Sequence, residues 1–154
     1  MSPADVVQAS MRAWENNDAE ALASCLTGDF FCAGQMPEKL NNIQFVDYMK
    51  NLMRAFPDWK FNEHIVNTRG DRVTVNVSIT GTNTGELVVP GLPPILPTDK
   101  PIALPPRDWE YTIRGDQISF LSTDMFNRPG GGFAGILAQL GMALPTYDSA
   151  LREE

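Results

Sequence analysis

The sequence is poor in the residues that bind transition metals. Its 154 residues include one histidine, His64, and two cysteines, Cys25 and Cys32. The spacing of these three residues matches none of the common zinc motifs, and a single histidine cannot form a histidine-rich site. We therefore expect no metal site. We also expect both cysteines to be buried thiols, as free cysteines usually are.

Positive charge and long apolar runs are scarce as well. The chain has 12 lysines and arginines against 19 aspartates and glutamates, a net charge of −7. Such a body does not attract phosphates or acidic lipids, so we expect no nucleic-acid partner and no membrane partner. No apolar run approaches the roughly 20 residues of a membrane span, and residues 1–5 lack the features of a signal peptide. We expect a cytoplasmic protein that binds a small molecule.

Apolar residues at helical spacing predict three helices in the first part of the chain. Ser2-Pro3 is typical of a helix start, and Asp18 is placed to cap a second, short helix that runs through Cys25. A third helix is predicted over residues 42–56, because Pro57 ends it. A short strand at residues 30–33 lies between the second and third helices.

The rest of the chain is predicted to be strands, followed by a last helix over residues 133–142. Arg-Gly-Asp occurs twice between strand-like runs, which places two-residue hairpin turns at Gly70-Asp71 and Gly115-Asp116. The resulting register pairs Arg69 with Arg72, Ile65 with Asn76, Ile113 with Ile118, Tyr111 with Phe120, Trp109 with Ser122 and Arg107 with Asp124.

The first hairpin is predicted to be apolar on both faces. Helices cover only one face of a sheet, so an apolar row on the other face would be wet in a monomer. We therefore predict a homodimer through the sheet face, since symmetric dimers are the commonest oligomers. The row that would be covered is Val73, Val75, Val77 and Ile79.

The order of elements predicts an α+β fold in a single domain over residues 1–154. One segment, residues 81–100, is rich in proline and glycine and interrupts the strands. Within it, residues 86–98 are too apolar to remain in water. We expect them to form an ordered, proline-stiffened flap beside a pocket or a dimer edge.

Several motifs, taken in order, resemble the SnoaL-like polyketide cyclases, which have the nuclear transport factor 2-like fold. They are Phe-Pro-Asp-Trp at 56–59, Gly-Thr-Asn-Thr-Gly at 81–85, Pro-Thr-Asp-Lys at 97–100 and Gln-Leu-Gly at 139–141. The resemblance implies a cone-shaped domain around an apolar pocket. In such a cone, a curved, mostly antiparallel sheet has three N-terminal helices on its concave side, and a short C-terminal helix follows.

The chain departs from the family pattern at two positions in these motifs. Asn83 stands where the family frequently has a histidine, and Asp99 stands where the family usually has a glycine. The loop between these two motifs is also longer than in the family. These differences concern the pocket and its ligand rather than the fold.

Asp124-Met125-Phe126-Asn127 resembles the end of the last strand in related cone-fold enzymes. The resemblance implies that Asp124 is the general acid/base of an intramolecular aldol closure that needs no metal and no organic cofactor. A carboxylate desolvated by aromatic neighbours would have a raised pKa, which suits a base. The residues expected to bind a small hydrophobic carbonyl substrate are Arg107, Trp109, Tyr111, Phe126 and Trp59.

The residues alone leave other interpretations open. Asp124 is equally suited to a strand-end ion pair with Arg107 or to a helix cap. The fold also hosts proteins without catalytic activity, so the chain is alternatively a module that binds a small-molecule ligand, or a protein-binding domain that uses its sheet.

Overall fold

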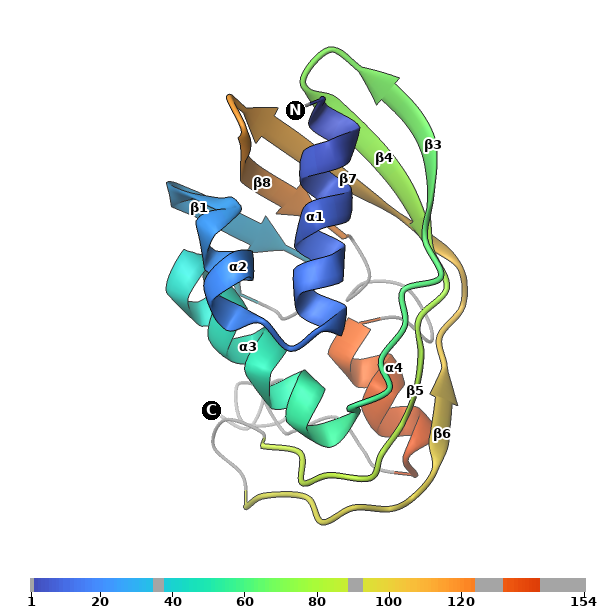
Figure 1. Ribbon diagram of the computed structural model, residues 1–154. Helices are drawn as coiled ribbons and strands as arrows, with labels where there is room; N and C mark the ends of the chain where they lie inside the picture. The colour runs from blue at the N-terminus through green and yellow to red at the C-terminus, as the bar shows by residue number, and fades with distance from the viewer. Residues whose placement is uncertain (1, 35–37, 89–92, 124–131, 142–154) are drawn as a thin grey trace, which may run out of the picture.

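The computed structural model describes residues 2–34, 38–88, 93–123 and 132–141 (Figure 1). The helices are α1 (Pro3–Glu15), α2 (Ala19–Ser24), α3 (Asn42–Ala55) and α4 (Gly132–Gln139). The strands are β1 (Leu26–Ala33), β2 (Leu40–Asn41), β3 (His64–Arg69), β4 (Arg72–Val77), β5 (Thr80–Thr82), β6 (Pro101–Ala103), β7 (Arg107–Arg114) and β8 (Gln117–Ser122). No helix within these ranges is long and apolar enough to cross a membrane.

Local sequence signals fix the starts of the helices. At α1, the Ser2 hydroxyl accepts a hydrogen bond from the Asp5 N–H, and the Asp5 carboxylate accepts one from the Ser2 N–H, each at 3.2 Å. Asp18 caps α2 in the predicted manner, through the Ala21 N–H. The predictions for these helices and for α3 are therefore confirmed, because each cap satisfies backbone donors that the helix leaves free.

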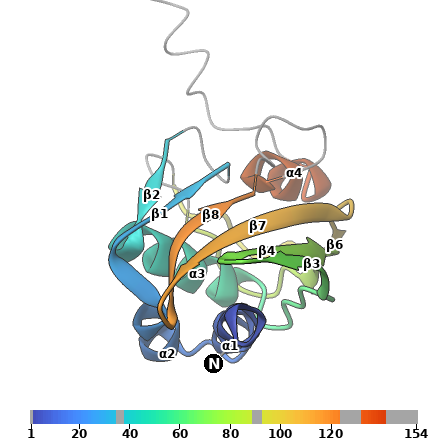
Figure 2. The same cartoon turned by 90° about the horizontal axis from the view of Figure 1, so that it is seen from above.

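Six strands form one curved sheet in the order β2-β1-β8-β7-β4-β3, and β5 pairs with β6 in a second, two-stranded sheet. The pairing of β1 with β8 is parallel and the other pairings are antiparallel. The large sheet curves over α1, α2 and α3, as the view from above shows (Figure 2). The predicted α+β class is confirmed.

The turns of both hairpins are confirmed, but the register is wrong beyond the first pairs. Arg69 pairs with Arg72 as predicted. A bulge between Ile65 and Asn67 then places Ile65 opposite Val75 instead of Asn76. A bulge inserts one residue into one strand, so it reverses which face every later side chain occupies.

The second hairpin contains a bulge of the same kind. Ile113 pairs with Ile118 as predicted, but the register shifts beside Thr112. The two predicted pairs that follow are wrong, because Tyr111 lies opposite Leu121 and Glu110 lies opposite Ser122. The predicted pair of Arg107 with Asp124 extends beyond the described residues.

The row of apolar side chains that suggested a dimer faces the interior. All four residues are buried within one chain, at most 2% exposed. Two of the valines on β4 lie opposite aromatic residues of β7, Val75 opposite Trp109 and Val73 opposite Tyr111. The expectation of an apolar outer face on this hairpin was therefore wrong, and the homodimer is left without the argument that suggested it. The buried residues are Val73, Val75, Val77 and Ile79.

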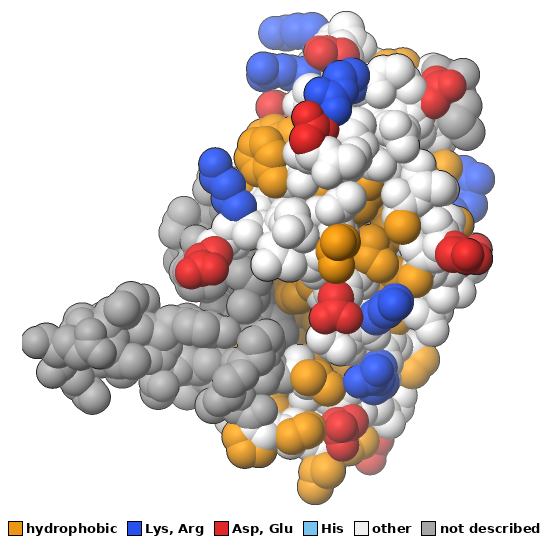
Figure 3. Space-filling model, turned by 90° about the vertical axis from the view of Figure 1, so that its left-hand side faces the viewer, with side chains coloured by type: hydrophobic (Ala, Val, Ile, Leu, Met, Phe, Trp, Pro, Cys, Tyr) orange, Lys and Arg blue, Asp and Glu red, His pale blue; other side chains and the backbone are white. Residues whose placement is uncertain are grey.

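The opposite face of β4 and β7 carries polar side chains. Thr74 lies opposite Glu110, and Asn76 lies opposite Asp108, with the Asn76 amide donating to the Asp108 carboxylate at 3.0 Å. These strands therefore alternate between apolar and polar residues, as expected for a sheet with one wet face. On another face of the molecule, acidic and basic side chains are scattered between small apolar groups (Figure 3).

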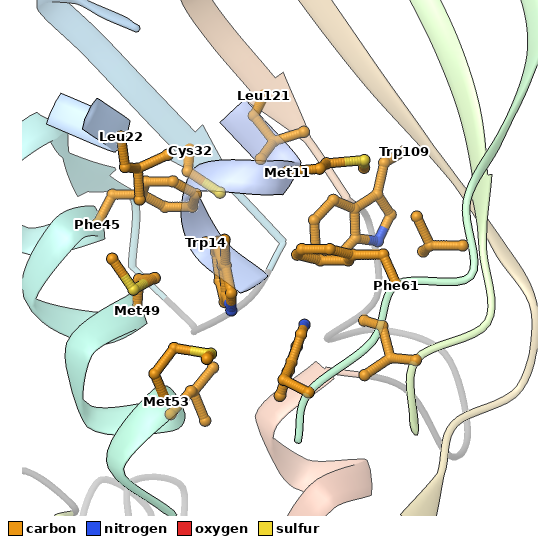
Figure 4. Close-up of a cluster of buried hydrophobic side chains, with 14 of the residues drawn as sticks. Met11, Trp14, Leu22, Cys32, Phe45, Met49, Met53, Phe61, Trp109 and Leu121 are labelled. Carbon is orange, nitrogen blue, oxygen red and sulfur yellow. The ribbon is translucent and has the colours of Figure 1, made fainter. Parts of the chain in front are cut away.

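Aromatic side chains fill the space between the helices and the sheet (Figure 4). Trp14 of α1 stacks on Trp59, with ring centroids 5.5 Å apart. Phe61 lies edge-on to Trp14 at 5.2 Å and to Trp109 at 5.6 Å. Such aromatic pairs each contribute about 1 kcal/mol beyond the burial of their surface. This aromatic cluster joins α1, the segment after α3, and β7.

The proline-rich segment is ordered on both sides of residues 89–92, which lie outside the described residues. Leu87 is fully buried, and its backbone forms two hydrogen bonds with the backbone of Ile95. Leu96 is 72% exposed, so the expectation that all apolar residues of the segment avoid water was wrong at this position. Its place beside a pocket or a dimer edge stays a prediction.

The last glycine of the Gly-Thr-Asn-Thr-Gly motif touches the end of α3. The Gly85 N–H donates to the Ala55 carbonyl at 3.2 Å. A Cβ on Gly85 would lie 1.8 Å from the Arg54 carbonyl oxygen, far inside van der Waals contact. The motif therefore requires glycine here for packing, because no side chain fits between the two backbones.

We predict that Gly85→Ala lowers the free energy of unfolding by about 3 kcal/mol, because the backbone of the loop or of α3 must move to admit the methyl group. Urea unfolding followed by circular dichroism measures the change. Gly28→Ala on β1 is the matched control, because a Cβ there meets nothing within 4 Å. A Gly85→Ala protein as stable as the Gly28→Ala protein would contradict the packing argument.

An ion pair on the surface links β1 to the end of β7. The Arg114 guanidinium donates to the Asp29 carboxylate, which also accepts a hydrogen bond from the Thr27 hydroxyl at 2.8 Å. The hydrogen bond from Arg114 is the main cause that lowers the pKa of Asp29 from 3.8 to about 2. The folded state therefore stabilises the charged form of Asp29 more than the unfolded state does.

The lowered pKa of Asp29 predicts a dependence of stability on pH. The ion pair contributes stability above about pH 4, and this contribution is lost as the pH falls towards 2. Asp29→Asn should therefore be less stable than the parent protein at pH 5 and equally stable at pH 2, measured by urea unfolding. Arg114→Gln should show the same convergence. A difference that stays constant from pH 5 to pH 2 would contradict the role of the carboxylate.

Candidate functional site

A polar hollow of about 430 Å³ lies where β8 ends and β7 begins. β7 and the residue before it supply most of its wall, and β4 and the end of β8 supply the rest. The hollow is therefore built on the rigid part of the sheet, not on the proline-rich segment. Its described lining residues are Asn76, Pro106, Arg107, Asp108, Glu110, Ser122 and Thr123.

Arg107 is the one predicted binding residue that lines this hollow. It lies opposite Val77 in the sheet, on the same face as Trp109, because side chains alternate along a strand. Its guanidinium donates to the Pro106 carbonyl at 2.9 Å. The residue is half-buried, so it presents a positive charge at the edge of the apolar interior.

The acidic side chains of the hollow already have partners. Asp108 accepts the hydrogen bond from Asn76, and Glu110 lies 3.6 Å from the Arg72 guanidinium. Both carboxylates are on the outer face of the sheet and are exposed. They are therefore bound to polar neighbours in water and are not desolvated.

Thr123 fixes the point at which the chain leaves β8. It is buried, and both its N–H and its hydroxyl donate to the Ala33 carbonyl, at 3.0 and 3.2 Å. The next residue in the sequence is Asp124. Asp124 and Phe126, the predicted catalytic residue and one predicted binding residue, lie outside the described residues. Their roles stay predictions.

The other predicted binding residues are aromatic and buried. Trp59 and Trp109 lie on two sides of Phe61, with ring centroids 5.9 and 5.6 Å from it. Tyr111 is hydrogen-bonded to Ser10 of α1, and burial raises the pKa of its phenol. The structure therefore brings Trp59 and Trp109 into one cluster, whereas Tyr111 is engaged with α1.

Sequence reasoning missed most of the polar lining. It selected aromatic residues on β7 and overlooked Asp108 and Glu110, which lie between them on the other face. Their alternation with Trp109 and Tyr111 was the signal that identified a wet outer face. Ser122 and Thr123 carried no comparable signal, because only the fold brings the end of β8 beside the start of β7.

Asn83, the residue at the family's histidine position, acts as a structural clip. It is fully buried, and its side-chain oxygen accepts hydrogen bonds from the N–H and the hydroxyl of Thr98, both at 2.9 Å. Its amide donates to the carbonyls of Gly85 at 2.9 Å and Ala55 at 3.3 Å. Asn83 thus ties the two ends of the proline-rich segment to α3.

The other departure from the family pattern concerns the backbone. Asp99 has a φ of +58°, in the left-handed region that glycine adopts without strain. Aspartate tolerates this region better than most residues do, which accounts for its presence where the family has a glycine. Both departures are therefore explained by local structure and do not concern the hollow.

The cysteines lie apart from the hollow. Cys32 is buried, and burial raises the pKa of its thiol to about 12, so the thiol stays protonated. Cys25 is half-buried. The prediction of two buried thiols is confirmed for Cys32 and only in part for Cys25. Within the described ranges, no three histidine, cysteine, aspartate or glutamate side chains gather where a metal ion would bind.

A curved, mostly antiparallel sheet over N-terminal helices, with a hollow at its edge, defines the cone-shaped class of nuclear transport factor 2-like proteins. The sequence model of the SnoaL-like polyketide cyclase family matches residues 4–106, more than half of the chain. The chain therefore belongs to this family, and the expected resemblance is confirmed. No curated protein matched the sequence of this chain.

Solved structures agree with the cone fold. IdmH from Streptomyces antibioticus, a proposed polyketide cyclase, has 21% identity and a TM-score of 0.68, with 92% of this chain and 100% of that chain covered. AclR from Streptomyces galilaeus, a proposed hydroxylase, has 18% identity and a TM-score of 0.67, with 90% and 95% covered. A proposed polyketide cyclase from Pseudomonas putida has 19% identity and a TM-score of 0.64, with 79% and 90% covered.

We predict that Asn83→Ala lowers the free energy of unfolding by about 2–4 kcal/mol. The substitution removes the hydrogen bonds of the Asn83 side chain to Ala55, Gly85 and Thr98, and each lost hydrogen bond costs about 1 kcal/mol. Thr84→Ala, at the exposed neighbouring position, is the control and should be nearly neutral. Thermal and urea unfolding measure both. Equal stability of the two variants would show that Asn83 does not clip the segment.

Proposed function

We propose that this chain is a cofactor-independent cyclase or isomerase that acts on a small hydrophobic carbonyl compound, with Asp124 as general acid/base. Its membership of the SnoaL-like polyketide cyclase family supports the class of reaction. The observation that carries the proposal is the position of Arg107. Its guanidinium lines the same hollow as Thr123, the residue that directly precedes Asp124.

The proposed reaction needs a base and a positive charge, and no covalent nucleophile. The Asp124 carboxylate removes a proton from a carbon between two carbonyl groups. The resulting enolate carbon attacks a further carbonyl group elsewhere in the same molecule, forming a carbon–carbon bond and an alkoxide. Asp124 then returns the proton to the alkoxide oxygen, so atoms and charge balance. Arg107 stabilises the negative oxygen while it develops.

The other carboxylates near Arg107 are less suited to this role. Asp108 and Glu110 are exposed, and they contact Asn76 and Arg72. A base that works near neutral pH needs a raised pKa, which requires an apolar environment. This difference supports Asp124, whose chain position follows a buried residue, over the two acids on β7.

The alternative function is a non-catalytic module that binds a small hydrophobic molecule. The proteins of similar structure differ in the activity proposed for them, and AclR is a proposed hydroxylase. A protein from Catenulispora acidiphila with a ketosteroid isomerase-like fold was solved in complex with trimethylamine. One fold therefore accommodates different ligands and activities, and the fold does not select among them.

Asp124→Asn tests the catalytic proposal. The amide keeps the size of the side chain but cannot accept the proton, so turnover should fall by roughly 10²–10⁴-fold while ligand affinity changes little. A panel of β-dicarbonyl compounds and polycyclic esters is first screened with the parent protein by product formation. Asp47→Asn makes the same chemical change on the exposed face of α3 and should keep full activity.

Three outcomes would contradict the proposal. Equal turnover by the parent protein and Asp124→Asn would remove Asp124 from the mechanism. Binding of panel compounds without turnover of any of them would favour the ligand-binding module. A loss of stability in Asp124→Asn with unchanged activity would instead identify Asp124 as a partner of Arg107.

A further inference from the structure

Two tryptophan side chains in the aromatic cluster have buried N–H groups without a hydrogen-bond partner. Trp14 is 3% exposed and Trp59 is 2% exposed. No described acceptor lies within hydrogen-bond distance of either indole nitrogen. Buried tryptophan N–H groups normally have a partner, because an unpaired buried donor is costly. Two such donors on rings that stack together require an explanation.

The neighbouring aromatic rings do not supply a hydrogen-bond acceptor for these two N–H groups. Trp14 and Trp59 stack with an angle of 28° between their planes, and both lie edge-on to Phe61. A ring face accepts a hydrogen bond only weakly, so it does not replace an oxygen atom. The two donors are best satisfied by an acceptor that is not part of the protein.

The two indoles are held rigidly together. Trp14 lies in the last turn of α1, and the next residue, Glu15, accepts a hydrogen bond from the Phe61 N–H at 2.9 Å. The backbone N–H of Trp59 donates a hydrogen bond to the Phe56 carbonyl at the end of α3. The segment that carries Trp59 is therefore fixed to both helices. Fixed donors lose little entropy when a ligand binds.

The walls around the indoles are adaptable, although the indoles are fixed. Met49 and Met53 extend from α3 beside Trp14, and Met11 lies beside Trp109 (Figure 4). All three methionines are buried. Methionine is unbranched and changes its rotamer at low cost, so it makes room where a branched side chain would not. Displacement of methionine side chains is therefore the change by which a flat ligand would gain space in this cluster.

A row of aromatic rings leads from the cluster to β7, the strand that also carries Arg107. Trp59, Phe61 and Trp109 form a row of rings with centroids 5.9 and 5.6 Å apart, and Arg107 follows Trp109 on the same face of β7. We propose that the indole N–H groups of Trp14 and Trp59 bind a carbonyl oxygen of a flat, apolar ligand held between the helices and the concave face of the sheet. This inference rests on the proposed function for its class of ligand and adds the inner anchor.

The test compares two probes of the same shape. 1-Indanone is a flat bicyclic ketone, and indane is the same ring system without the oxygen. Isothermal titration calorimetry on the full chain should show 1-indanone binding about tenfold more tightly, because only the ketone satisfies the buried donors. Indane is the more apolar of the two, so the hydrophobic effect alone would produce the opposite order.

Variants assign the preference to the two indoles. Trp14→Phe and Trp59→Phe each keep an aromatic ring but remove a donor, so each should reduce the preference for the ketone, and the double variant should abolish it. Phe45→Leu is the control, because Phe45 packs on Trp14 at 5.6 Å without touching the donors. It should change the affinity for both probes and leave their ratio intact. Near-ultraviolet circular dichroism checks that each variant is folded.

Several outcomes of these measurements would overturn the inference. Equal affinity for the two probes, or no binding of either, would do so, as would a ketone preference that survives in the double variant. An ordered water bonded to both indoles in a crystal with 1-indanone would do the same.

1-Indanone has no second carbonyl group and does not undergo the proposed reaction. Its selective binding would therefore stand even if Asp124→Asn showed that the catalytic proposal is wrong.

Discussion

The stack of Trp14 on Trp59 is the contact on which the arrangement of this protein depends. It joins the end of α1 to the segment after α3, and Phe61 extends the contact to Trp109 on β7. The hydrogen bond from the Phe61 N–H to Glu15 holds the same segment at a second point. The helices are therefore fixed to the concave face of the sheet by large rings, which leave little space but bring polar N–H groups into an apolar interior.

Features set by neighbouring residues were predictable from the sequence. The helix caps at Ser2 and Asp18 use side chains within three residues of the groups they bind. The hairpin turns depend on glycines with positive φ, Gly70 and Gly115, whose conformation the local sequence requires. The family was predictable as well, because its motifs record packing constraints in a fixed order along the chain. One of these constraints is the contact of Gly85 with the end of α3.

The register beyond the turns was not predictable, because each bulge depends on contacts across the fold. Val66, the additional residue on β3, is 52% exposed and belongs to no apolar pattern that would reveal it. The shift places Ile65 opposite Val75, on the same face, so the argument for apolar side chains on both faces failed. The candidate site was affected in the same way, since Asp108 and Glu110, which line the hollow with Arg107, were overlooked.

The bulge on β8 also decides which aromatic residues remain available to the interior. It places Leu121 on the inner face beside Tyr111 and turns Phe120 outward, where its ring lies 4.5 Å from that of Phe31. Lys39 lies over Phe31 at 4.9 Å, so this outer pair is partly covered by a cation. The inner face at this level is thus lined by Leu121 and by Tyr111, whose phenol is already hydrogen-bonded to Ser10. The donors and rings suited to a flat ligand are consequently concentrated lower in the cone, around Trp14 and Trp59.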